Sequence, residues 1–198
     1  MLFRSSQAVA LIDPERAAQI DGIAADPARY LDDKITAIRP RTKELVTLAL
    51  LRLAAVDPNA AARELESLKW RNQLTAEERS HAWGAIGRRA AQRLQTDALD
   101  FYARGELQHM TDEHLAWMAR AGLRLGRWTA VRDAIYAMSP AQRADSDWVY
   151  WRARAIEALQ EPDAVVARAQ ARSLYESIAS TSDFHGMLAL ETLGVPIT

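Results

Sequence analysis

The sequence contains no cysteine, few glycines and no long apolar run, and each shortage excludes a class of protein. Without cysteine the chain has no disulfide, no thiolate nucleophile and no zinc site built on sulfur ligands. Its 8 glycines form no phosphate-binding loop. The longest apolar run, residues 45–56, contains Thr47 and Arg52 and falls short of the roughly 20 residues of a membrane-spanning helix. We therefore predict no membrane span.

Charge and short motifs exclude further classes. The formal net charge of -1 lacks the basic excess that is typical of nucleic-acid-binding domains, so no nucleic-acid partner is expected. Met1–Ser6 shows no basic segment followed by an apolar stretch, so no secretory signal is expected in this chain. No zinc-protease or serine-hydrolase motif is present, and His109 and His114, five residues apart, do not share a helical face. The sequence predicts no metal site, no cofactor and no catalytic residue.

Three tryptophans recur at a fixed spacing of 34 residues, at Trp83, Trp117 and Trp151, and the next step reaches His185. The segments 117–121 and 151–155 share four of their five residues. We call the four positions spaced by 34, namely Trp83, Trp117, Trp151 and His185, the ladder. A period of this size is typical of stacked helix pairs, since one pair cannot bury its apolar face alone. We predict an all-α fold, a right-handed α-α superhelix (solenoid) of antiparallel helix pairs, forming a single domain over residues 1–198.

Start signals locate the helices. Asp-Pro pairs at Asp13, Asp26 and Asp57 place a capping side chain before a proline at the first helical position, and Thr75 with Glu78 forms a capping box. No segment alternates with the period of a strand. The predicted helices are residues 14–24, 27–37, 41–55, 58–69, 76–94, 97–104, 112–124, 128–138, 147–160, 163–179 and 183–193.

The ladder tryptophans are expected to face the core. Four residues after each ladder residue, the sequence has a small residue: Gly87, Ala121, Ala155 and Ala189. This spacing places the ladder residue and the small residue on one helical face, and the small residue lets a partner helix approach closely.

The aromatic cluster at Trp148, Tyr150 and Trp151 is the most suggestive binding feature, since aromatic faces stack on sugar rings and nearby arginines bind carboxylates. The ladder assigns Trp151 to the core, and Trp148, three residues earlier, is expected to extend that core. Trp148, Arg152 and Arg154 are therefore the candidate substrate-binding residues, with core packing and a solvated face as the alternatives.

Several segments carry a resemblance to a known family. They are Trp-Val-Tyr-Trp-Arg-Ala-Arg-Ala at 148–155, the stretches 117–131 and 134–138, Phe-His-Gly-Met-Leu-Ala-Leu-Glu-Thr-Leu-Gly at 184–194, and, upstream, residues 45–94. Together they resemble the superhelical domain of the soluble lytic murein transglycosylases, over roughly residues 41–194. His185 departs from the Tyr that commonly follows the Phe in that family. Tetratricopeptide repeats share the period of 34, but their Leu, Gly and Tyr after the Trp are not matched here.

The resemblance implies a periplasmic protein in which the superhelical domain and a C-terminal lysozyme-like domain close a ring around a peptidoglycan glycan strand. The catalytic domain uses one Glu, usually followed by Ser, to cleave the strand and leave a 1,6-anhydromuramyl product. Glu66-Ser67 and Glu176-Ser177 lie on predicted amphipathic helices without glycine-rich surroundings, so neither is expected to be catalytic.

The preferred hypothesis is thus a non-catalytic scaffold segment, a fragment of a longer chain whose catalytic domain is absent here. Its partners would be the glycan strand and that domain. Polar faces would meet the carboxylates of peptide stems through Arg88, Arg89, Arg120, Arg124, Arg152 and Arg154. The alternative is an independent tetratricopeptide-like adaptor that binds a protein partner on a concave surface.

Overall fold

The computed structural model describes residues 13–33 and 35–195, and it is helical nearly throughout, with no strand in those ranges. This confirms the all-α prediction. Met1–Ser6, where the sequence was searched for a secretory signal, lies outside the described residues. The helices are α2 (Pro14–Ala25), α3 (Pro27–Asp32), α4 (Pro40–Val56), α5 (Pro58–Glu66), α6 (Leu68–Gln73), α7 (Ala76–Gln92), α8 (Ala98–Tyr102), η1 (Leu107–His109), α9 (Asp112–Leu125), α10 (Trp128–Ala137), α11 (Pro140–Arg143), α12 (Ser146–Leu159), α13 (Ala164–Ile178) and α14 (Phe184–Leu193).

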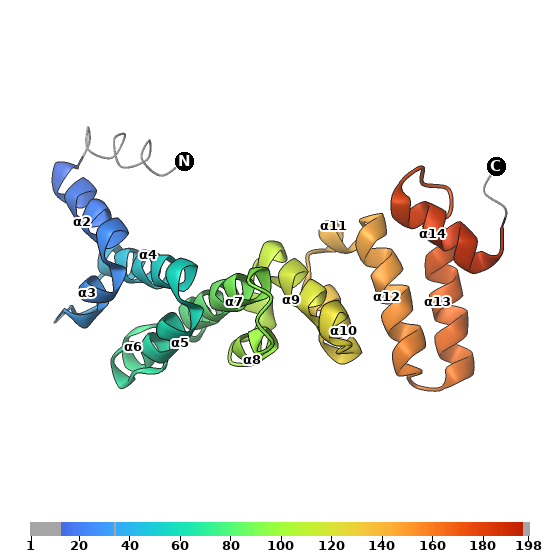
Figure 1. Ribbon diagram of the computed structural model, residues 1–198, viewed down its shortest axis with the longest axis horizontal. Coiled ribbons are helices and arrows are strands. Elements are labelled where there is room, and N and C mark those ends of the chain that lie inside the picture. Colours follow the sequence, from blue (N-terminus) through green and yellow to red (C-terminus); the bar gives the residue numbers. More distant parts are fainter. Residues whose placement is uncertain (1–12, 34, 196–198) are drawn as a thin grey trace.

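The helices follow one another in an elongated row, with α2 at one end and α14 at the other (Figure 1). Each helix packs against near neighbours in sequence: α4 against α5 and α7, α7 against α8 and α9, α9 against α10, and α12 against α10, α13 and α14. Figure 1 shows α12 and α13 side by side and joined at one end, as expected of an antiparallel pair. Contacts of this local kind are those of a superhelical solenoid.

Capping residues set the helix starts as the sequence predicts. The carboxylates of Asp13, Asp26 and Asp57 each accept a hydrogen bond from the backbone N–H three residues on. Thr75 and Glu78 form the reciprocal capping box at the start of α7. Asp145 occupies the N-cap of α12, yet its side chain caps no N–H there.

Two predicted helices are wrong in extent, one beside a long-range contact and one at a local break. The segment predicted as 27–37 ends at Asp32, where the Lys69 ammonium donates to the carbonyl oxygens of Leu31 and Asp33 at 2.6 Å each. The segment predicted as 58–69 breaks at an extended Ser67 into α5 and α6, and the Trp70 indole N–H donates to Glu64 across the break at 2.6 Å. The sequence analysis also missed the short η1 turn.

The ladder is buried less evenly than predicted. Trp83 is 5% exposed, whereas Trp117 and Trp151 are only partly buried against the core. The Trp83 ring is covered by a parallel Phe101 ring, with a centroid separation of 6.4 Å, while Trp151 meets Tyr150 and His185 edge-on. The four small residues of the ladder are all buried, as predicted.

The hydrophobic core runs along the row of helices. One buried cluster extends from Ile23 to Ala155, and a second joins α12, α13 and α14 around Tyr150 and Tyr175. Trp151 packs against both clusters, so it connects the last helices to the rest of the core. Among the described helices, none is both long and apolar enough to cross a membrane.

Candidate functional site

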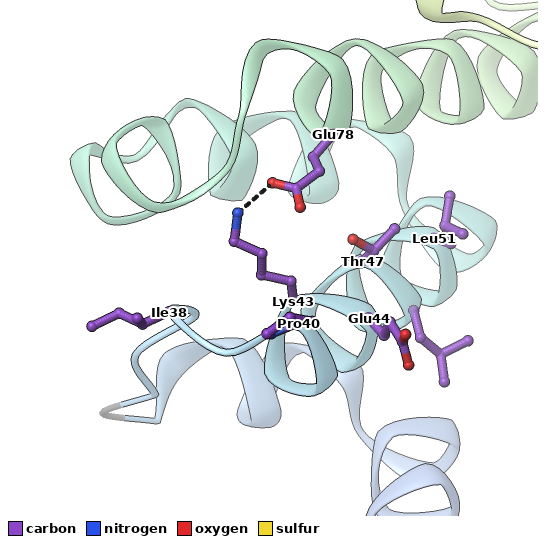
Figure 2. Close-up of a pocket in the computed structure, with 8 residues that line it drawn as sticks. Ile38, Pro40, Lys43, Glu44, Thr47, Leu51 and Glu78 are labelled. Atoms are coloured by element: carbon purple, nitrogen blue, oxygen red, sulfur yellow. Dashed lines mark hydrogen bonds and ion pairs between the residues drawn. The ribbon is translucent and has the colours of Figure 1, made fainter.

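Three clefts are lined by the first helices of successive pairs, α4, α7, α9 and α12. The first cleft, of about 680 Å³, lies between α4 and the start of α7 and is lined mainly by apolar groups (Figure 2). Lys43 Nζ donates a hydrogen bond across this cleft to Glu78 Oε2, at 3.0 Å. Ile38 stands at its edge and is 76% exposed.

Glu78 is held as a carboxylate in this cleft. Partial burial acts to raise its pKa, but the hydrogen bond from the Thr75 backbone N–H and the contact with Lys43 outweigh it, so the pKa lies below its ordinary value. A general acid needs the opposite shift. Glu78 therefore caps α7 and anchors it to α4.

A second cleft, of about 470 Å³, adjoins the first and shares Thr47 and Glu78 with it. Two histidines line it, His81 and His109, and the His81 ring lies 5.0 Å from the buried ring of His114. Burial lowers the pKa of His114 to about 4, with further contributions from His81 and Arg88, so its ring is neutral and accepts at the capping box of α9. Within residues 13–33 and 35–195, no cluster of His, Asp and Glu is suited to hold a metal ion.

The third cleft, of about 520 Å³, lies between α9 and the α11–α12 segment. It is the most polar of the three and is lined by Asp112, Glu113, Ala116, Arg120, Gln142, Asp145, Ser146, Asp147 and Trp148. The guanidinium carbon of Arg120 lies 5.3 Å from the ring centres of both Trp117 and Trp148. Two indole rings thus hold one guanidinium group at the wall of this cleft.

The structure separates the three candidate residues that the sequence grouped. Trp148 is 4% exposed and belongs to the core, although it also lines the third cleft. Arg152 stacks on Tyr136 of α10 at 5.0 Å, and Arg154 contacts Tyr150 and Glu157 instead. The arginine that meets Trp148 is Arg120, which the sequence named only as one of six basic residues on polar faces. The signal for it was its place three residues after Trp117 on one helical face.

The two Glu-Ser pairs lack the setting of a catalytic acid. Glu66 is exposed on α5 and forms an ion pair with Arg104. Glu176 is exposed on α13 and pairs with Arg172 at 2.9 Å. Neither carboxylate lies in an apolar pocket of the kind that keeps a general acid protonated.

Comparison with known proteins gives one informative similarity. No family model matches the chain, and no curated protein matches it. Among solved structures, it is similar to the X-ray structure of an inactive mutant of lytic transglycosylase Slt from Pseudomonas aeruginosa, with a TM-score of 0.70 and 26% sequence identity over 98% of this chain. The chain resembles a domain of a lytic transglycosylase. It spans 31% of the length of that structure, and the similarity agrees with the all-α superhelical fold.

Proposed function

We propose that this chain is a non-catalytic superhelical domain of a longer, periplasmic lytic transglycosylase. The domain helps to form the ring that holds a peptidoglycan glycan strand, while a separate domain cleaves the strand to 1,6-anhydromuramyl products. The observation that carries the proposal is the similarity to Slt, which extends over 98% of this chain but only 31% of that structure.

The electrostatics of the described residues support a scaffold role. Glu66 and Glu176 are exposed and paired with arginine, and Glu78 has a pKa below its ordinary value. Lytic cleavage requires a carboxyl group that can donate a proton to the departing sugar oxygen. Such a group normally lies in an apolar pocket without a cation beside it, a setting that none of these three has.

The shape also supports a holding role. A row of short helix pairs curves by small rotations between neighbours and offers an extended surface, as solenoids do when they bind elongated ligands. The three clefts follow one another along α4, α7, α9 and α12, so they are spaced along the length of the row of helices.

The test combines binding and activity. We expect the purified chain to co-sediment with murein sacculi and to release no soluble muropeptides. The same chain unfolded by heat is the control, and it should remain in the supernatant. Release of anhydromuramyl products by this chain alone would overturn the non-catalytic role. Failure to sediment, together with capture of a defined protein partner, would favour the adaptor hypothesis.

A further inference from the structure

The third cleft contains charges that its own residues leave only partly balanced. Four carboxylates line it, and two of them have basic side chains as partners: Glu113 pairs with Arg88, and Asp147 accepts from His185 Nδ1 at 2.8 Å. The remaining charges of the cleft are two carboxylates and one guanidinium group.

These two carboxylates, Asp112 and Asp145, have neutral partners in the described part of the chain. Asp112 accepts from the backbone N–H and the hydroxyl of Ser139 at 2.7 and 2.6 Å. Asp145 accepts from the Gln142 amide at 2.8 Å. Neither has an ion-pair partner within residues 13–33 and 35–195, so their oxygens are available to a positively charged group that enters the cleft.

The guanidinium group of Arg120 is oriented but not neutralised. It lies between the rings of Trp117 and Trp148, and it forms no ion pair within residues 13–33 and 35–195. The rings fix the position of the guanidinium group, and its five N–H donors can bind a carboxylate through two parallel hydrogen bonds. The start of α12 in the same cleft adds a favourable dipole, since the Asp145 side chain caps none of its N–H groups.

We propose that the third cleft binds the zwitterionic end of an amino acid, in which an ammonium and a carboxylate group share one carbon. The carboxylate binds Arg120, and the ammonium binds Asp112 and Asp145. The proposal rests on the proposed function for its source of ligand, the free ends of diamino acids in the peptide stems of peptidoglycan. The cleft volume of about 520 Å³ accommodates such an end.

The direct test is a titration of the ¹⁵N-labelled chain with meso-2,6-diaminopimelic acid, observed at the indole N–H signals of Trp117 and Trp148 and at the Arg120 side-chain N–H. We expect saturable shifts at these three signals. The di-N-acetyl derivative, which lacks the ammonium groups, and the diamide, which lacks the carboxylates, should each bind about tenfold more weakly or worse. These ligand changes leave the protein untouched, so they test the proposal even where a variant folds poorly.

Two protein variants separate the site from general charge effects. Arg120→Gln should weaken binding by about tenfold, and Asp145→Asn by a smaller factor. Arg168→Gln is the matched control because it removes the same charge from an exposed position on α13, where the side chain donates only to its own helix. Its affinity should equal that of the wild type.

The absence of saturable shifts would overturn the proposal, as would equal losses for Arg120→Gln and Arg168→Gln. Undiminished binding of the acetylated ligand would likewise refute recognition of a zwitterion. Binding to sacculi is a separate readout. If diaminopimelic acid binds through Arg120 while the chain fails to sediment with sacculi, the binding site is supported and the proposed function is refuted. If the chain sediments with sacculi but does not bind diaminopimelic acid, only the binding site is refuted.

Discussion

Gly87 offers the sharpest test of how closely the helix pairs approach. It lies in α7 at the small position of the ladder, facing α8. A Cβ atom added there would meet the Tyr102 ring at 2.7, 2.8 and 2.9 Å. Tyr102 is fully buried, so its rigid ring cannot rotate into solvent to relieve the overlap.

The cost of Gly87→Ala follows from these distances. Carbon atoms in contact prefer about 3.5–4.0 Å, so the ring or the helix must shift by roughly 0.7 Å or more, and overpacking of this kind costs about 1–3 kcal/mol. Alanine returns up to about 1 kcal/mol through its higher helix propensity. With the full offset, the middle of the overpacking range gives an expected net loss of about 1 kcal/mol in the free energy of unfolding, or a fall in melting temperature of about 2–4 °C for a chain of this size.

Gly22→Ala is the matched control. Gly22 also lies inside a helix, α2, but a Cβ atom there would have nothing within 4 Å. Because there is no steric clash, only the higher helix propensity of alanine acts, and this variant should be more stable than the wild type by up to about 1 kcal/mol. Thermal melts and urea titrations of the three chains measure both changes. A Gly87→Ala chain as stable as the wild type, or a loss of equal size in the control, would refute the packing argument.

Two further predictions concern the core and its histidine. Ala155 is fully buried, so Ala155→Leu should lower the free energy of unfolding by about 1–3 kcal/mol, measured by thermal melts. Ala158 is exposed on the same helix, so Ala158→Leu should change the stability little. Equal effects of the two variants would contradict the assignment of the buried face. Burial lowers the pKa of His114 from 6.5 to about 4. Burying the neutral ring therefore contributes its full stability above pH 6.5. This contribution, about 3 kcal/mol, is lost as the pH falls from 6.5 through 4. His114→Gln keeps a capping side chain and removes this titration, so urea unfolding at pH 7 and pH 4 should show a smaller loss in the variant than in the wild type; equal losses would refute the assignment.

Local chemistry explains which parts of the fold the sequence could predict. Asp13, Asp26 and Asp57 act within three residues of their own position, so the pattern that names them as caps also contains their hydrogen-bond donors. The small ladder residues are likewise read from one helix at a time, because residues four apart share a face. The all-α class follows from such signals summed along the chain.

Contacts between distant residues account for what the sequence could not predict. The end of α3 depends on Lys69, more than thirty residues away, which binds the last carbonyl oxygens of the helix. The third cleft depends on the contact between Arg120 of α9 and Trp148 of α12. The sequence grouped Arg152 and Arg154 with Trp148 as substrate-binding candidates because they are neighbours along the chain, and in the structure their side chains contact Tyr136 and Glu157.

The ladder shows how a repeat can hold one geometry while its side chains change roles. At each step the residue four positions later is small and buried, so the close approach of helices is maintained from Gly87 to Ala189. The ladder residues differ in their contacts. Trp83 packs on Phe101 and also meets the Arg104 guanidinium at 5.2 Å, Trp117 meets Arg120, and His185 takes the fourth position and pairs with Asp147. Arg120 and Asp147, the partners of Trp117 and His185, both line the third cleft. The same repeat that builds the scaffold therefore also places the candidate binding site.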